Sequence, residues 1–192
     1  MTANTNTAIA QQPTVLNGVD VNQIMDVIGS IETDPAFAAA QFRVKNQWID
    51  GGLNRSRIKE FYAACEEDTT RDEAFMLDAD EPAIMAGGNS VPNPVEFLLH
   101  ALAGCLTTTL VYHSAVRGLK IRAIESDLEG DLDLRGLFGL SDRISKRPQA
   151  VRVKMRVRSQ ASIDELKEMA QFSPVYDTVS QSLPVGLVIE KF

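Results

Sequence analysis

The stretch N-P-V-E-F-L-L-H-A-L-A-G-C-L-T-T-T-L-V-Y-H-S-A-V-R-G, residues 93–118, decides the fold. It predicts one long helix, because Asn93 is a good N-cap, Pro94 stands where a first turn tolerates proline, and Glu96 completes a capping box. Gly118 suits the position just beyond the C-cap. Apolar residues occupy almost every face between these ends, so we expect the helix to be buried.

Cys105, near the middle of this predicted helix, is the residue whose role decides the function. A buried cysteine usually serves as a small hydrophobic side chain. A reactive cysteine needs a cation or a helix N-terminus beside its thiolate, and Cys105 lies too far into its own helix for that helix to help. Cys105 is therefore either core packing or a nucleophile that needs an arginine from elsewhere. Three acidic residues directly follow Cys65, so we interpret Cys65 as structural.

The two histidines of the same helix do not predict a metal site. His100 and His113 are thirteen residues apart, which is not a ligand spacing, and no acid or cysteine completes a ligand set. The sequence also contains no Walker motif, no glycine-rich nucleotide fingerprint and no G-x-S-x-G. We therefore expect neither a metal nor an organic cofactor.

Composition narrows the class of protein. A chain of 192 residues is long enough for one domain with a substantial core. The net charge of −7 argues against nucleic acid or an anionic membrane surface as a partner. The N-terminus lacks the basic and apolar segments of a signal peptide, and no apolar window looks long enough, without interruption, to span a bilayer. Two cysteines forty residues apart do not make a disulfide framework, so we expect a cytoplasmic protein.

The chain divides into an arm and a domain. Residues 1–40 predict an N-terminal arm, polar and mobile over residues 1–18 and then forming a short amphipathic helix that ends at Asp34 and Pro35. Residues 41–192 predict the domain itself, with strands before the long helix and both strands and helices after it. This order indicates an α+β fold with a buried helix against an antiparallel sheet.

Two strands that follow the long helix are expected to pair. In residues 124–134 apolar residues alternate with acidic ones, and in residues 151–158 they alternate with basic ones. Faces of opposite charge and equal period indicate antiparallel neighbours with ion pairs between them. The connection, residues 136–148, is long enough to be a lid or a dimer contact.

The remaining elements are shorter. Residues 66–72 read as a charged turn between strands. A capping box at Ser162 opens a helix, and another short helix starts at Ser173, which a proline follows. Residues 183–189 read as a final strand.

Three segments together resemble the OsmC/Ohr family of osmotically inducible and organic hydroperoxide resistance proteins. N-P-V-E-F-L-L-H-A-L-A-G-C-L (93–106) is similar to its central-helix signature, and F-S-P-V-Y-D-T-V (172–179) is similar to its second motif. D-E-P-A-I-M-A-G-G-N-S-V-P (80–92) is similar to the loop before the helix. The resemblance covers residues 41–192 and implies an OsmC/Ohr-like fold and an intertwined homodimer with its sites at the interface.

The same resemblance implies roles for individual residues. Cys105 matches the peroxidatic cysteine, which reduces a hydroperoxide and becomes a sulfenic acid. Ser173 occupies the position of the resolving cysteine, so the family's intramolecular disulfide cannot form there. Arg55 and Arg57 are both candidates for the arginine that holds the thiolate. Glu96 stands one residue after the position of the family's glutamate, and one residue turns a helix by about 100°, so it need not face the thiol.

We therefore expect a single-cysteine peroxidase that reduces organic hydroperoxides in the response to oxidative stress. An external thiol, of which a lipoyl-bearing protein is one example, would regenerate it. The alternatives are a catalytically inactive homodimer of this fold that binds a small apolar ligand and a purely structural dimer, with Cys105 as core packing in both. An arginine near Cys105, and a pocket that opens at its sulfur, would distinguish the enzyme from the other two.

Overall fold

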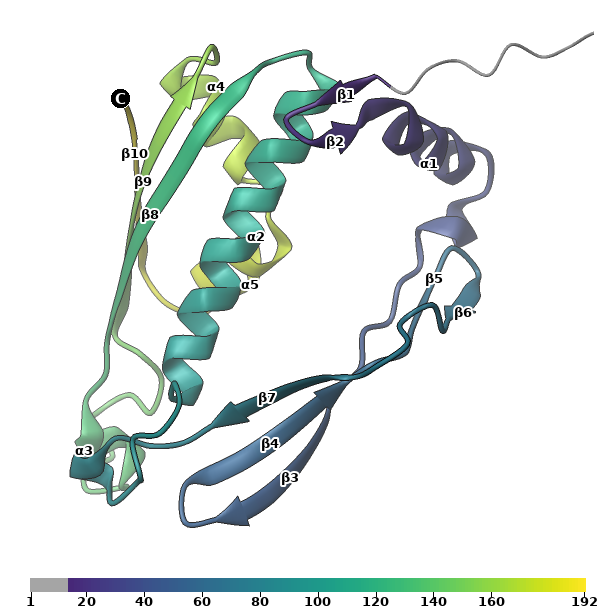
Figure 1. Ribbon diagram of the computed structural model, residues 1–192. Coiled ribbons are helices and arrows are strands. Elements are labelled where there is room, and N and C mark those ends of the chain that lie inside the picture. The colour runs from purple at the N-terminus through teal and green to yellow at the C-terminus, as the bar shows by residue number, and fades with distance from the viewer. Residues whose placement is uncertain (1–13) are drawn as a thin grey trace, which may run out of the picture.

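The computed structural model describes residues 14–192 and has the expected α+β architecture (Figure 1). Residues 1–13, which hold most of the predicted mobile arm, lie outside the described part. The larger sheet has the strand order β10-β9-β8, and the smaller one has the order β3-β4-β7. The strands of the larger sheet are β8 (Ile121–Asp131), β9 (Ala150–Ser159) and β10 (Val185–Lys191). The strands of the smaller sheet are β3 (Lys45–Asp50), β4 (Leu53–Ile58) and β7 (Phe75–Ala79).

Helix α2 (Pro94–Val116) is the predicted central helix, with the predicted ends. The side chain of Asn93 accepts hydrogen bonds from the backbone N–H groups of Val95 and Glu96. The carboxylate of Glu96 accepts one from the backbone N–H of Asn93 at 2.7 Å, which completes the capping box. Gly118 has a φ of 71°, the left-handed conformation in which glycine commonly ends a helix.

One face of α2 is buried and the opposite face is not. Leu102, Leu106 and Leu110 have no exposed surface and belong to the same core as the inward side chains of β9. Helices α4 (Ile163–Ala170) and α5 (Pro174–Ser182) pack beside α2 on this side of the sheet. The expectation of burial on almost every face therefore holds for one side only within a single chain. The exposed face carries Ala101, Gly104, Thr108 and Tyr112.

By length and mean hydropathy, α2 is also long and apolar enough to cross a bilayer, contrary to the expectation from its polar interruptions. This is weak evidence for a membrane span, because the core helix of a folded domain meets the same criteria. Within one chain, 17% of its most apolar stretch is buried. The contact with the sheet accounts for the apolar side chains of one face and leaves the other uncovered.

The predicted antiparallel pairing of an acidic and a basic strand is confirmed for β8 and β9. Arg156 bonds to Glu125 at 2.5 Å and Arg152 bonds to Glu129 at 3.0 Å, so the cross-strand ion pairs form on the outer face. The inward face carries the alternating valines and methionine of β9, all of which are buried. Exposed ion pairs of this kind contribute little to stability, so the pairing of β8 with β9 is stabilised mainly by burial of the inward face.

The larger sheet is mixed rather than wholly antiparallel, because β10 runs parallel to β9. A parallel neighbour requires a long crossover, and residues 160–184 supply one that contains α4 and α5. The β8 strand also ends earlier than predicted. Asp133 caps the short helix α3 (Leu134–Leu137) by accepting a hydrogen bond from the backbone N–H of Arg135, so Leu134 belongs to a helix and not to a strand.

The charged turn predicted over residues 66–72 is wrong at its start. β6 (Glu66–Asp68) pairs with β5 (Phe61–Ala63) in an antiparallel hairpin. The chain reverses at Ala64 and Cys65, whose φ angles are 52° and 64°. Two successive positive φ angles are typical of the tight hairpin turn whose twist matches that of its strands.

The described part of the N-terminal arm is attached to the larger sheet. β1 (Val15–Leu16) and β2 (Val19–Asp20) form a hairpin that leads into α1 (Val21–Thr33) and the short helix at Pro35–Ala38. The side-chain amide of Asn17 donates to the backbone oxygen of Leu119 at 2.9 Å and accepts from the backbone N–H of Ile121 at 2.8 Å. Residues 14–18 are thus a fixed hairpin and not the mobile arm expected there.

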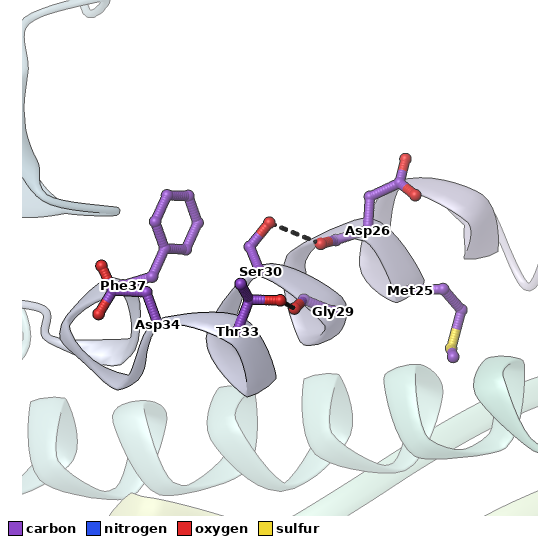
Figure 2. A pocket seen from close by; sticks show the side chains of 7 residues that line it. All are labelled: Met25, Asp26, Gly29, Ser30, Thr33, Asp34 and Phe37. Carbon is purple, nitrogen blue, oxygen red and sulfur yellow. Dashed lines mark hydrogen bonds between the residues drawn. The ribbon is translucent and has the colours of Figure 1, made fainter.

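Helix α1 has an open pocket of about 580 Å³ along one side. Figure 2 shows Met25 and Phe37 at its two ends and polar side chains between them. Ser30 donates to the backbone oxygen of Asp26 and Thr33 donates to that of Gly29, so both hydroxyl protons are used within the helix. The pocket therefore lacks a free hydroxyl donor among these lining side chains.

Candidate active site around Cys105

The thiol of Cys105 lies against the start of α5. Ser173 is the N-cap of that helix, and its Oγ lies 3.1 Å from Cys105 Sγ. Ser173 is fully buried, whereas Cys105 is half-buried and retains access to solvent. The structure thus brings together the two positions that the resemblance identifies as peroxidatic and resolving.

The direction of this hydrogen bond follows from the other partner of Ser173. Its Oγ accepts a hydrogen bond from the backbone N–H of Tyr176 at 3.2 Å, as an N-cap side chain does. A hydroxyl has one proton to donate, and that proton is not used in this contact. Ser173 is therefore able to donate its proton to the sulfur of Cys105, and such a donor favours the thiolate.

The N-terminus of α5 provides the second stabilising influence on a thiolate at this position. The first turn of a helix carries partial positive charge, which attracts a negatively charged group beside it. Sequence reasoning considered only the helix that carries Cys105 and concluded that an arginine was required. The signal for the second helix was present, because Ser173 followed by proline marks a helix start. The family resemblance placed Ser173 beside the thiol, but the sequence reasoning did not connect this helix start with the charge that it brings to the sulfur.

Arg55 and Arg57 both lie on β4, in the smaller sheet. Arg55 makes two hydrogen bonds of 2.7 Å to Asp78 on the neighbouring strand, and these raise the pKa of Arg55 and lower that of Asp78. Arg57 lies 3.7 Å from Glu60. Within one chain, both arginines therefore pair with acids of the segment between β4 and α2. In Figure 1 their strand is set apart from the middle of α2.

Glu96 is used in the capping box of α2. It precedes Cys105 by nine residues, which places it about 180° around the helix and roughly 13 Å away along the axis. Its carboxylate therefore lies on the other side of α2 from the thiol. The threonines that follow Cys105 have a local role at Thr108, whose hydroxyl donates to the backbone oxygen of Gly104 at 2.6 Å.

Comparison with models of known protein families identifies the family of this chain. The sequence model of the OsmC-like proteins matches residues 87–188, which is more than half of the chain and includes Cys105 and Ser173. The chain belongs to the OsmC-like protein family. The matched range begins after β4, so Arg55 and Arg57 lie outside it. No curated protein sequence matches the chain significantly.

Solved structures of the family share its fold. An OsmC-like protein from Mycoplasma pneumoniae has a TM-score of 0.59 and 13% identity, over 79% of this chain and 96% of that one. An organic hydroperoxide resistance protein from Elizabethkingia anophelis has a TM-score of 0.56 and 12% identity, over 79% and 97%. An organic hydroperoxide resistance protein OsmC from Legionella pneumophila has a TM-score of 0.54 and 12% identity, over 78% and 97%. About a fifth of this chain therefore lies outside each match.

The second cysteine of this OsmC-like protein is not part of the site. Cys65 is exposed at the tip of the β5–β6 hairpin, and both cysteines are free thiols. Figure 1 shows that hairpin on the far side of the molecule from α5. Among the residues that the structure describes, no cluster of histidine, cysteine and acidic side chains is arranged to hold a metal ion.

His113 contacts the residue directly before Ser173. Its ring stacks on Phe172 with centroids 4.6 Å apart and planes 17° from parallel. Burial lowers the pKa of His113 below its ordinary value, and the positive charge of Arg117 lowers it further. Arg117 in turn pairs with Glu168 of α4 at 3.0 Å. These contacts tie the end of α2 to the segment that leads into α5.

The lowered pKa of His113 predicts a loss of stability in acid. As the pH falls, the unfolded chain binds a proton at His113 near pH 6.5, and the folded chain binds it only at lower pH. The contribution of neutral His113 to the free energy of unfolding is therefore complete above about pH 6.5 and decreases below it. His113→Phe keeps a stacking ring without the proton. We expect its urea midpoint to change less between pH 7.5 and pH 5.5, about one unit to either side of that value, than the wild-type midpoint does. Equal changes in the two proteins would contradict the assignment.

Proposed function

We propose that this OsmC-like protein is a cytoplasmic thiol-dependent peroxidase that reduces organic hydroperoxides through Cys105. The observation that carries the proposal is the 3.1 Å contact between Cys105 Sγ and the buried hydroxyl of Ser173 at the N-terminus of α5. A cysteine that served only as core packing would not need a hydrogen-bond donor and a helix N-terminus at its sulfur. The proposal of organic hydroperoxides as substrates is supported by similar structures that bear the name organic hydroperoxide resistance protein.

The first step oxidises Cys105. The thiolate sulfur attacks the outer oxygen of the hydroperoxide ROOH, so that an S–O bond forms while the O–O bond breaks. The outer oxygen keeps its hydrogen and becomes part of the sulfenic acid. The alkoxide that leaves takes up a proton from water and becomes the alcohol ROH. The hydroxyl of Ser173 supports this step by stabilising the thiolate before the attack.

The second step requires an external thiol, because Ser173 has no sulfur with which to form a disulfide. One sulfur of a dithiol attacks the sulfenic sulfur, water leaves, and a mixed disulfide forms. The second sulfur of the dithiol then attacks the first and releases the Cys105 thiolate. The sum is ROOH and a dithiol giving ROH, water and a disulfide. A lipoyl-bearing protein has the required chemistry.

The active form in this proposal is a homodimer. The exposed face of α2 and the exposed apolar side chains of the smaller sheet, among them Trp48 and Phe75, need a cover that one chain does not provide. A second copy is the natural cover, since the family resemblance implies an intertwined dimer. In such a dimer the smaller sheet of one copy would carry Arg55 or Arg57 to the Cys105 of the other.

A second candidate function rests on a cavity at the start of α2. This cavity of about 250 Å³ lies between the smaller sheet and the helix, and most of its lining is apolar, including Val44, Ile58, Leu77 and Phe97. It is suited to a small apolar ligand. Phe97 precedes Cys105 by roughly two turns, so a ligand there would not touch the thiol. In this alternative the protein binds the ligand without catalysing a reaction, and loss of Cys105 would not affect that binding.

Cys105→Ser distinguishes the two functions. Removal of the nucleophile should lower the rate of cumene hydroperoxide consumption by at least about a thousandfold with a dithiol as reductant. The matched control is Cys65→Ser, which removes the exposed thiol and should leave the rate unchanged. Hydroperoxide loss measured with dihydrolipoamide and with a monothiol also identifies the reductant class. Equal rates in wild type and Cys105→Ser would leave the binding function standing.

Ser173→Cys should convert the hydrogen-bonded pair into a disulfide-forming pair. The two side chains already touch, and a shift of about 1 Å brings two sulfur atoms to bonding distance. After one equivalent of peroxide, mass spectrometry under non-reducing conditions should find Cys105 bridged to the introduced thiol. Ser173→Ala is the control and should form no bridge. If wild-type Cys105 is oxidised but the variant forms no bridge, the placement of Ser173 is wrong.

Sedimentation velocity tests the homodimer. We expect a species of twice the 21.0 kDa of one chain at micromolar concentration, because the uncovered apolar faces disfavour a free single chain. A folded species of one chain under these conditions would contradict the homodimer and, with it, the supply of an arginine to Cys105 by a second copy.

A further inference from the structure

The loop between β8 and β9 exposes an apolar tip. Leu137, Phe138 and Leu140 are 48%, 58% and 73% exposed. The tip nevertheless has a defined backbone, because the N–H of Leu140 donates to the backbone oxygen of Arg135 at 2.8 Å and Gly139 adopts the left-handed conformation with a φ of 66°. These side chains are therefore held outward by an ordered turn.

The same loop carries cations without acidic partners. Arg143, Lys146 and Arg147 are exposed, and none of the three forms an ion pair within the described residues 14–192. Arg135, by contrast, is paired with Asp133 at 2.6 Å. Between residues 134 and 149, Asp142 is the one acidic residue. The loop is thus locally basic on a chain whose net charge is −7.

A close backbone contact holds the apolar tip against the segment that carries Arg143, Lys146 and Arg147. A Cβ atom on Gly136 would come within 2.2 Å of the backbone oxygen of Ser145, so only glycine permits this approach. Residues before the tip therefore pack directly on residues among the cations. The loop joins the end of β8 to the start of β9, and Figure 1 shows its helix α3 at one end of the molecule.

We propose that this loop docks on an anionic lipid membrane. Exposed leucine and phenylalanine side chains enter the boundary between headgroups and acyl chains, and nearby arginine and lysine bind the lipid phosphates. The negative charge of the whole protein does not prevent this, because salt screens charges beyond about 8 Å and the three cations are the charges nearest the membrane. The exclusion of membranes from net charge alone took no account of this local arrangement.

A second copy of the chain is a less suitable partner for the same loop. If the two-fold axis passed through this loop, each loop would meet its own copy and two sets of three unpaired cations would come together. Lipid phosphates instead supply the opposite charge in a plane, beside an apolar layer that accepts the tip. The proposal concerns docking alone and does not depend on the thiol chemistry of Cys105.

Vesicle flotation tests the proposal with the full chain. Wild-type protein should float with phosphatidylcholine vesicles that contain about one-third phosphatidylglycerol and should not float with pure phosphatidylcholine. Each cation near an anionic surface contributes roughly a fivefold gain in partitioning, so Arg143→Gln/Lys146→Gln/Arg147→Gln should weaken binding by about a hundredfold. Phe138→Ser/Leu140→Ser should also abolish flotation. The matched control Lys120→Gln/Arg122→Gln/Lys167→Gln removes three exposed cations elsewhere and should still float.

A fluorescence reporter makes the test independent of flotation. Trp48 is the single tryptophan, so Trp48→Phe/Phe138→Trp carries one at the tip. Its emission should shift to shorter wavelength with the anionic vesicles and remain unshifted with neutral ones. Absence of wild-type binding, or equal binding by the loop variants and the control, would overturn the proposal. Dissociation of a dimer by Phe138→Ser/Leu140→Ser would also overturn it, by assigning the tip to a second copy.

Discussion

Helix α2 lies with Leu102, Leu106 and Leu110 buried against the larger sheet, and this contact fixes the rotation of the helix about its axis. Cys105 is next to Leu106 in sequence, so it lies about 100° around the helix from the centre of the buried face. That angle places the thiol at the edge of the core, where α5 reaches it and solvent does too. A deeper position would hide the sulfur, and a more exposed one would separate it from Ser173.

The position of α5 depends on the same core. Val179 of α5 is buried with the leucines of α2, and this contact presents the start of α5 to Cys105. The side chain of Ser173 then has two roles, because it caps α5 and also lies against the sulfur of Cys105. In the proposed reaction, a cysteine at this position would capture the oxidised sulfur in a disulfide within one chain, whereas a serine leaves that step to an outside thiol. The fold and the site thus share one set of contacts.

Sequence patterns with strong local causes were sufficient to predict much of this structure. The caps of α2, the capping box at Ser162 and the paired charges of β8 and β9 each depend on residues close in sequence or on a simple period. The parallel direction of β10 was not predictable from its own residues, because it is set by the crossover before it. The place of Ser173 beside Cys105 came from family resemblance, since 68 residues separate them in the chain.

Asn17 has a consequence beyond attaching the N-terminal hairpin. β8 is an edge strand, and its first residues present backbone groups that a foreign strand could bond. The carboxamide of Asn17 offers one donor and one acceptor in the spacing of a peptide unit, and it occupies the oxygen of Leu119 and the N–H of Ile121. A single side chain therefore imitates a neighbouring strand and closes this end of the sheet to intermolecular addition. Besides attaching residues 14–18 to the sheet, the N-terminal hairpin therefore leaves these two backbone groups unavailable to an added strand.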